Sequence, residues 1–208
     1  LDNNVFVARS ATINGKDWEK WNGSSWGGDP APAVDAELSA TETFFGAGEP
    51  SLVVKGDQIY LYYTYSDNEQ KIYNVRLMTA AASDPNWPAS MTDQGEVIDR
   101  TAFKGLNIDG CSVRYIEDQD CFQAVHGVNI ADVNSYSVVW VSKDGVSGWE
   151  QKGVLSNNIR VRAKYARFIC NEQSHITSTT PRLMIYQNGG QYSKTAWPTR
   201  MVPYSFVE

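Results

Sequence analysis

The chain has 208 residues, of which 42% are hydrophobic and 20% are charged, and this composition excludes a mainly disordered protein. A formal net charge of −6 without a basic stripe argues against a nucleic-acid partner, because phosphate backbones are bound by clustered lysine and arginine. No apolar run approaches the roughly 20 residues that a membrane helix requires, so we expect no membrane partner either.

The first residues read as the end of a repeating unit. Val5–Ser10 resembles the third strand of the units described below, and Asn14–Trp18 resembles the link that follows such a strand. We therefore interpret residues 1–21 as the tail of a preceding unit.

Residues 49–99 are predicted to form four short strands: Ser51–Lys55, Ile59–Tyr65, Val75–Ala80 and Gly95–Ile98. Gly56 and Asp57, between the first two strands, are typical of a two-residue hairpin turn. Trp87 lies in the connection between the third strand and the fourth.

Residues 109–155 repeat this plan with four strands: Ser112–Ile116, Phe122–Val128, Ser137–Val141 and Gly153–Leu155. Trp149 again lies between the third strand and the fourth. Residues 162–208 begin a further copy, for which we expect three strands: Tyr165–Ile169, Arg182–Gln187 and Met201–Val207.

Two markers recur along these units at similar intervals. Trp18, Trp87 and Trp149 fall at the same place in successive units, and we expect them to form core contacts between units. Glu49 and Asp109 precede the first strand of successive units and are therefore read as lying one repeat apart. No segment shows helical periodicity over three turns.

A repeat of this length with four short strands favours a β-propeller over a sandwich or a barrel. The predicted fold is therefore all-β, a β-propeller of four-stranded antiparallel blades of which this chain holds about three and a half. Ser51–Lys55 and Ser112–Ile116 are the expected innermost strands. We do not expect these residues to close a ring alone, so an upstream segment or another chain completes it.

The stretch Gly46–Val54, followed by Ile59–Thr64, resembles five-bladed propeller glycoside hydrolases of the arabinanase, β-xylosidase, levansucrase and invertase type. In that family an acidic residue followed by proline opens an innermost strand, as Glu49 does here, and links like Ser142–Trp149 join outer strands. The resemblance implies a glycoside hydrolase that acts on an oligo- or polysaccharide without a cofactor. The blade that usually carries the family's catalytic-base or nucleophile aspartate is missing from the units found here.

Glycoside hydrolysis usually needs two carboxyl groups, one protonated as general acid and one ionised. Innermost strands converge on the axis of a propeller, so acids that precede successive inner strands are expected to share one cleft. We predict Glu49 as general acid, and Asp109 as base or as the group that raises the pKa of Glu49. The structural alternative is that each acid caps a strand entry or binds turn amides.

Three further residues are candidates for binding substrate. Arg114 and Arg167, near the starts of inner strands, are predicted to bind sugar hydroxyls or a carboxylate, with a structural ion pair as the alternative. Trp26, in a long irregular connection, is a candidate platform for a sugar ring, because aromatic side chains cover the apolar faces of pyranoses. Two isolated histidines give no metal-ligand pattern, so we predict no metal site.

The three cysteines, Cys111, Cys121 and Cys170, lack zinc-site spacing. They are either three buried thiols or one disulfide and one free thiol. If a bridge forms, we favour Cys121–Cys170, and a bridge favours a secreted or periplasmic protein.

Two other functions remain open. The first is a propeller that binds carbohydrate without catalysis. The second is a structural repeat module whose open sheet edges pair with another chain.

Overall fold

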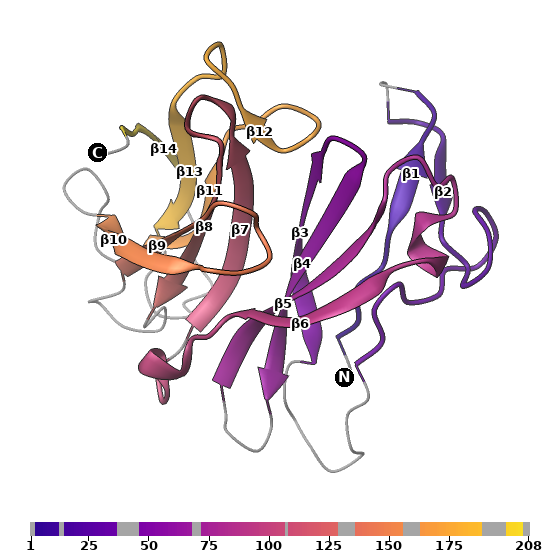
Figure 1. The fold of residues 1–208 in the computed structure, drawn as a ribbon, viewed down its shortest axis with the longest axis horizontal. Coiled ribbons are helices and arrows are strands. Elements are labelled where there is room, and N and C mark those ends of the chain that lie inside the picture. Colours follow the sequence, from indigo (N-terminus) through magenta and orange to yellow (C-terminus); the bar gives the residue numbers. More distant parts are fainter. Residues whose placement is uncertain are drawn as a thin grey trace.

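The computed structural model describes the chain in eight segments: residues 3–12, 15–36, 46–67, 72–106, 108–128, 136–155, 163–188 and 199–205. Within them the regular structure is β-strand with three single-turn 3-10 helices, so the predicted all-β class is confirmed. The described strands form four sheets, which we number I to IV along the chain (Figure 1). No helix in these segments is long and apolar enough to cross a membrane.

Sheets I and II come from the N-terminal half of the chain. Sheet I is an antiparallel pair: β1 (Ala8–Ser10) and β2 (Trp18–Lys20). Sheet II has four antiparallel strands in chain order: β3 (Ala47–Lys55), β4 (Gln58–Asp67), β5 (Ile72–Ala81) and β6 (Thr92–Ile98). All four strands predicted between residues 49 and 99 lie within these observed strands.

Sheets III and IV come from the C-terminal half. Sheet III contains the four strands predicted between residues 109 and 155: β7 (Ile108–Ile116), β8 (Cys121–Val128), β9 (Tyr136–Ser142) and β10 (Glu150–Leu155). Sheet IV has three described strands: β11 (Ala163–Phe168), β13 (Leu183–Asn188) and β14 (Thr199–Pro203). Sheets II and III therefore have the predicted four-strand order.

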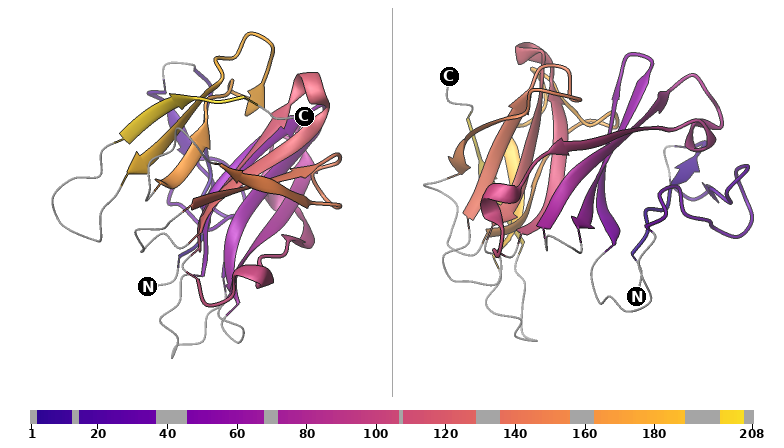
Figure 2. Two further views of the ribbon diagram at one scale, coloured as in Figure 1. Left: turned by 90° about the vertical axis from the view of Figure 1, so that its left-hand side faces the viewer. Right: turned by 60° about the horizontal axis from the view of Figure 1, so that its bottom comes forward.

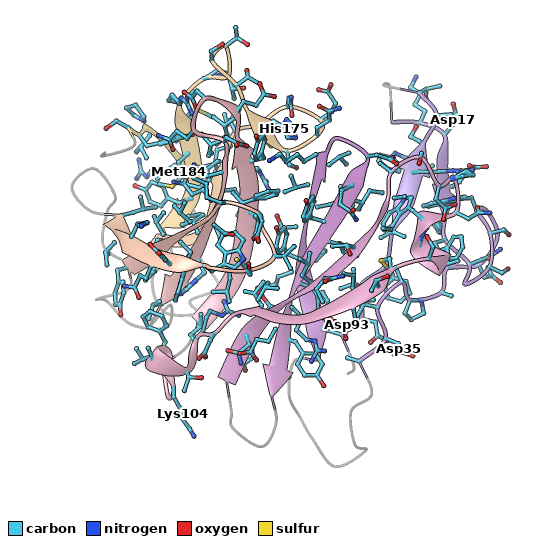
Figure 3. All side chains as sticks on the ribbon, viewed as in Figure 1. Asp17, Asp35, Asp93, Lys104, His175 and Met184 are labelled. Carbon is cyan, nitrogen blue, oxygen red and sulfur yellow. The ribbon has the colours of Figure 1, made fainter. Side chains whose placement is uncertain are left out.

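Sheet III also has a fifth, short strand that the sequence pattern did not predict. β12 (His175–Ile176) pairs in parallel with the end of β7 (Figure 3). The ring of His175 holds it there, because Nδ1 lies 2.9 Å from the Glu117 carboxylate and Nε2 lies 2.5 Å from the Val54 carbonyl. This histidine thus joins the connection between β11 and β13 to sheets II and III.

The first strands of sheets II, III and IV lie side by side. β3 packs against β7, and β7 packs against β11. Ser51 in β3 joins two of them, since its hydroxyl oxygen accepts the Val113 N–H at 2.9 Å and also lies 3.2 Å from the Val113 carbonyl. The described sheets follow one another in an open arrangement, with sheet I at one end and sheet IV at the other (Figure 2).

Three hydrophobic clusters hold the described elements together. One cluster joins sheet II to sheet III and includes Tyr62, Leu77 and Phe122. A second joins sheet III to sheet IV, and a third joins the N-terminal segment to sheet II. Burial between faces of neighbouring sheets is therefore the main source of stability in the described chain.

The link between β9 and β10 covers the outer part of sheet II. Asp144 accepts hydrogen bonds from the backbone N–H groups of Ser147 and Val146, which hold its pKa down at about 2 and fix the turn. The turn presents the Gly145 carbonyl to the Tyr62 hydroxyl at 2.8 Å. Trp149 then packs edge-on against the Tyr62 ring, with 6.0 Å between ring centroids.

Only two of the three recurring tryptophans make the predicted core contacts. Trp149 packs on sheet II, and Trp87 packs against the N-terminal segment with its ring centroid 6.4 Å from that of Trp26. Each belongs to the link before a fourth strand and covers the preceding unit. The prediction is wrong for Trp18, which is 58% exposed and whose indole N–H donates to the Gly15 carbonyl of its own turn.

All three cysteines are free thiols. Cys111 and Cys121 are buried and Cys170 is half-buried, which matches the first of the two alternatives. The Cys121–Cys170 bridge that we favoured, if any formed, is not present.

Candidate functional site

Each innermost strand carries one extra residue near its start. In all three, two residues stand opposite a single residue of the next strand: Glu49 and Pro50 opposite Tyr63, Gly110 and Cys111 opposite His126, Tyr165 and Ala166 opposite Tyr186. Such β-bulges bend a strand and redirect its side chains, and they are common beside active sites. The shared bulge identifies equivalent positions in the three sheets.

The bulges correct the equivalence that we had assigned to the two acids. Ser51 and Ser112 both follow the bulge directly, so these two serines occupy equivalent positions in sheets II and III. Glu49 therefore corresponds to Gly110, and Asp109 corresponds to Gly48. The assumed pairing of Glu49 with Asp109 was one residue out of register, because a sequence pattern does not reveal which of two neighbouring residues occupies the bulge.

Glu49 has a backbone conformation that normally calls for glycine. Its φ is 51°, and Gly110, the equivalent residue in sheet III, has a φ of 54°. A side chain in this left-handed region costs about 1–2 kcal/mol relative to glycine. Strain of this kind persists where function requires a particular side chain. Glu49 thus marks this bulge as a candidate functional site.

The carboxylate of Glu49 crosses from β3 to β7. Its Oε2 accepts a hydrogen bond from the Gly110 N–H at 2.5 Å. Arg100, which is fully buried, donates to the Gly110 carbonyl at 3.2 Å. A Cβ at Gly110 would lie only 3.2–3.3 Å from the guanidinium nitrogens of Arg167, so a side chain at this position would crowd Arg167. One carboxylate and two guanidinium groups therefore surround one glycine.

Cys111 lies beside the same charges. Burial raises the pKa of its thiol to about 11, and the nearby Arg100 and Arg167 only partly oppose this rise. A thiol with this pKa is neutral at physiological pH and is not a nucleophile. Cys111 is therefore a packing residue of the site.

Arg114 joins two strands by hydrogen bonds to neutral groups rather than by the ion pair that we gave as its structural alternative. Its Nη1 donates to the Ser51 hydroxyl at 3.1 Å and to the Val113 carbonyl, so that it joins β3 to β7. Burial lowers its pKa, and Cys170 partly offsets this effect. We refer to Glu49, Arg100, Gly110, Arg114 and Arg167 as the axial cluster.

The structure does not bring all predicted site residues to this cluster. The backbone of Asp109 pairs with Gly127 next to the Glu49–Gly110 contact, but its side chain lies outside the described residues and its role stays a prediction. Trp26 packs at the outer contact with Trp87, and its indole N–H donates to the Pro85 carbonyl at 2.7 Å. Arg9 lies 4.5 Å above the Trp26 ring.

Sequence reasoning missed Arg100 and Gly110, and it left His126 without a role. A lone arginine after a strand and a glycine within one carry no pattern of their own. His126 stands opposite the sheet III bulge, where its Nδ1 accepts the Trp140 indole N–H at 3.2 Å. Burial, aided by Arg100, holds the pKa of His126 well below its usual value of 6.5, so the ring is neutral.

The depressed pKa of His126 makes stability depend on pH. Below pH 6.5 the unfolded chain binds a proton that the folded chain does not, so the free energy of unfolding falls as the pH falls. We expect a slope of at most about 1.4 kcal/mol per pH unit between about pH 6.5 and pH 5.5. Urea unfolding at several pH values measures it.

His126→Gln is the matched control, because an amide oxygen still accepts the Trp140 N–H but does not titrate. The free energy of unfolding of this variant should depend less steeply on pH, because its unfolding no longer takes up the proton of His126. An equal slope in the variant and the wild type would show that His126 does not carry the effect.

No group of three or more potential metal ligands occurs among the described residues. This finding covers only that part of the chain, and the absence of a metal in the catalytic chemistry remains an expectation.

No protein-family model matches this sequence, and no curated protein matches it. Solved structures, in contrast, share its fold at low sequence identity. A family 117 glycoside hydrolase from Zobellia galactanivorans aligns with a TM-score of 0.54 and 9% identity, over 89% of this chain and 51% of the other. The catalytic domain of a family 62 α-L-arabinofuranosidase from Coprinopsis cinerea aligns with a TM-score of 0.53 and 12% identity, over 88% and 66%.

A third similar structure is a β-1,2-mannobiose phosphorylase from Listeria innocua, with a TM-score of 0.52 and 13% identity over 88% of this chain and 47% of the other. This chain spans about half to two thirds of the length of these enzymes. The predicted resemblance to propeller-fold glycoside hydrolases is therefore confirmed at the level of the fold.

Proposed function

We propose that this chain is part of a secreted or periplasmic carbohydrate-active β-propeller and that the propeller is a glycoside hydrolase. Sheets II and III are then two of its blades, sheet IV and the N-terminal segment belong to two more, and the total is about three and a half. The remainder of the ring comes from another segment or another chain. Enzymes of this fold that act on glycosides support the proposal.

The observation that carries the proposal is the strained glutamate. A glycine would fit the sheet II bulge without strain, yet Glu49 occupies it and directs a carboxylate to the strand edge between sheets II and III. Strain at a position that redirects a side chain is typical of active sites.

The contacts of Glu49 bear on its role. The Gly110 N–H donates to the Glu49 carboxylate, so in this arrangement Glu49 is a hydrogen-bond acceptor. For Glu49 to act as the general acid, a second carboxylate must favour its protonated form, and Asp109, next to Gly110 in β7, is the residue proposed to do so. Arg114 and Arg167 would then orient substrate or hold the carboxylates in place, and Trp26 would bind sugar only outside this cleft.

A glycoside phosphorylase is the second candidate. The guanidinium group of Arg167, which is half-buried beside Gly110, suits an anionic co-substrate such as inorganic phosphate. One of the structures that share the fold is a β-1,2-mannobiose phosphorylase, so this fold is compatible with phosphorolysis.

Product analysis separates these functions. The protein is incubated with aryl-glycosides and a panel of oligosaccharides, with and without inorganic phosphate. We expect free sugars under both conditions, whereas sugar phosphates formed only with phosphate would establish the second candidate. Binding on a glycan array without any turnover would instead support a non-catalytic carbohydrate-binding propeller.

A further inference from the structure

The connection between β11 and β13, residues 169–182, runs from sheet IV onto sheets II and III, and we call it the strap. At the end of β3, the Val54 N–H donates to the Gln173 carbonyl at 3.1 Å. At the end of β7, the Tyr115 N–H donates to the Ser174 carbonyl, also at 3.1 Å. β12 then pairs in parallel with β7. The strap thus joins β3 and β7 at the ends that lie opposite their bulges.

The strap docks through few buried residues. All of it is described, and within it only His175 and Ile176 are buried. Its turn depends on the Asn171 side chain, whose oxygen accepts the N–H groups of Gln173 and His175 at 3.0 and 2.8 Å. Ser174 in that turn has a φ of 64°, a backbone conformation that disfavours residues other than glycine. The docked position of the strap therefore depends on what His175 contacts.

Both ring nitrogens of His175 face hydrogen-bond acceptors (Figure 3). Nδ1 lies 2.9 Å from a carboxylate oxygen of Glu117, a side chain that is 45% exposed, and Nε2 lies 2.5 Å from the Val54 carbonyl oxygen. A carbonyl oxygen and an ionised carboxylate only accept. Neutral imidazole has one donor nitrogen and one acceptor nitrogen, so in either tautomer one lone pair would face an oxygen. Only the doubly protonated ring donates both bonds.

The neighbouring charges also favour a cation at this ring. The charged and titratable side chains at this end of the strands are Lys55 of β3, Tyr115 of β7, Glu117, Asp118 and Asp120 in and just after the 3-10 helix η3 (Glu117–Gln119), and Cys170, Glu172 and Arg182 of the strap. Two of the three carboxylates beside η3 form ion pairs, at 2.7 Å with Arg182 and at 3.1 Å with Lys55. The third, Glu117, faces the ring, so a protonated ring completes the set of ion pairs.

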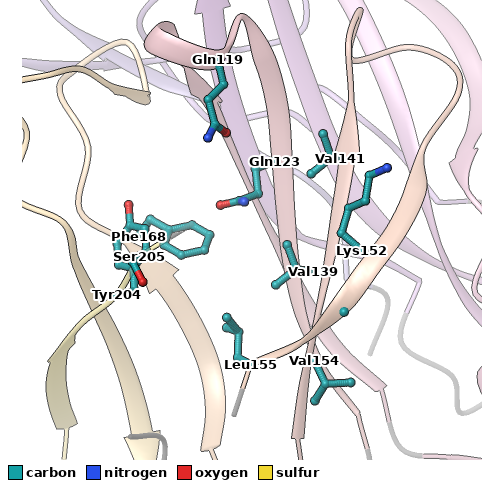
Figure 4. Close-up of a pocket in the computed structure, with 11 residues that line it drawn as sticks. Gln119, Gln123, Val139, Val141, Lys152, Val154, Leu155, Phe168, Tyr204 and Ser205 are labelled. Carbon is teal, nitrogen blue, oxygen red and sulfur yellow. The ribbon is translucent and has the colours of Figure 1, made fainter. Parts of the chain in front are cut away.

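The contacts of His175 lie apart from the cavity near η3. A pocket of about 600 Å³ lies between the outer strands of sheet III and the residues that follow β14 (Figure 4). Gln119, at the end of η3, lines this pocket, whereas Glu117 and His175 do not. The ring contacts therefore belong to the packing between the strap and the sheets.

We propose that the strap is a pH-dependent clamp: protonated His175 locks it onto sheets II and III, and loss of one ring proton to solvent releases it. The folded chain then holds on His175 a proton that the unfolded chain gives up above about pH 6.5, the ordinary value for histidine. The clamp therefore stabilises fully at acid pH, and its contribution is lost as the pH rises. His126 acts with the opposite sign, because it is neutral when folded. The clamp does not depend on the function proposed for Glu49.

Hydrogen exchange of the two backbone amides that the strap covers tests the clamp. Between about pH 5.5 and about pH 8.5, on either side of the ordinary value for histidine, we expect the protection of the Val54 and Tyr115 N–H groups to fall by about tenfold or more, after correction for intrinsic exchange. The reason is that a neutral ring loses a charge-assisted hydrogen bond. His175→Gln does not titrate and donates in one direction, so its protection should be low at both pH values. His126→Gln is the matched control and should keep the pH dependence of the wild type.

Nitrogen-15 spectra of the imidazole rings add a result that a folding defect does not mimic. Both ring nitrogens of His175 should carry a proton at the acid end of this range and one of them at the alkaline end, and His126→Gln assigns the signals because the chain has two histidines. Glu117→Gln keeps an oxygen acceptor but removes the charge, so the ring should lose its second proton at a lower pH than in the wild type. Protection of Val54 and Tyr115 that does not change with pH would overturn the proposal. A wild-type ring with a single N–H throughout would overturn it as well.

Discussion

Glu49→Gln is expected to lower kcat by about 10²–10⁴-fold while leaving carbohydrate affinity nearly unchanged, because a general acid contributes about this much to the rate. Glutamine keeps the shape of the side chain, and its amide oxygen still accepts the Gly110 N–H, so the bulge and the axial cluster stay in place. What it lacks is a transferable proton. Steady-state kinetics and isothermal titration calorimetry measure the two quantities.

Glu150→Gln is the matched control, because Glu150 is an exposed glutamate whose described contact is an ion pair with Lys152 on the same strand. Its kcat should equal that of the wild type. Unchanged turnover in Glu49→Gln would remove Glu49 from the chemistry. Lost carbohydrate binding in a protein without turnover would favour the binding function instead.

The leaving group of the substrate separates two roles for Glu49. If Glu49 is the general acid, Glu49→Gln should lose less activity on aryl-glycosides whose leaving groups need no proton. If Glu49 is the ionised partner, the loss should be similar for good and poor leaving groups. The second result would fit the hydrogen bond that the Gly110 N–H donates to Glu49 better, and it would assign the acid role to another carboxylate.

The sequence was sufficient to locate the strands of sheets II and III. Their hairpins are short and have clear turn residues such as Gly56 and Asp57, and their apolar runs are bounded by polar links. β12 was missed because its two residues have no pattern of their own. It exists because His175 bonds to Glu117 and Val54, which are distant in sequence.

The candidate site was predictable only in part. The Glu49-Pro50 pair correctly marked the start of β3 as irregular, because these two residues form the β-bulge. The predicted equivalence of Glu49 and Asp109 was wrong by one residue. Glu49 corresponds to Gly110, which shares its bulge position and its positive φ, and sequence spacing alone does not reveal either property. The contribution of Arg100 depends on tertiary packing around Gly110, for which the sequence carries no local signal.

The second large effect is expected from Gly145→Ala, which should lower the free energy of unfolding by about 2–5 kcal/mol. Gly145 has a φ of 76°, so any side chain there is strained. A Cβ would also lie 2.7 Å from the Tyr62 hydroxyl oxygen and 2.9 Å from the Phe122 ring. Both partners are fully buried in the cluster between sheets II and III and have little room to move.

Gly148→Ala in the same link separates strain from crowding. Gly148 has a φ of 59°, but no heavy atom lies within 4 Å of the position its Cβ would take, so only the backbone cost of about 1–2 kcal/mol applies. Burial raises the pKa of Tyr62 well above its usual value of 10, so its hydroxyl stays protonated and donates to the Gly145 carbonyl throughout the neutral range. Urea unfolding of both variants measures the difference. Equal losses would mean that the link shifts freely and that the contact of Gly145 with Tyr62 does not hold sheet III against sheet II, whereas a larger loss for Gly145→Ala would show that this contact joins the two sheets.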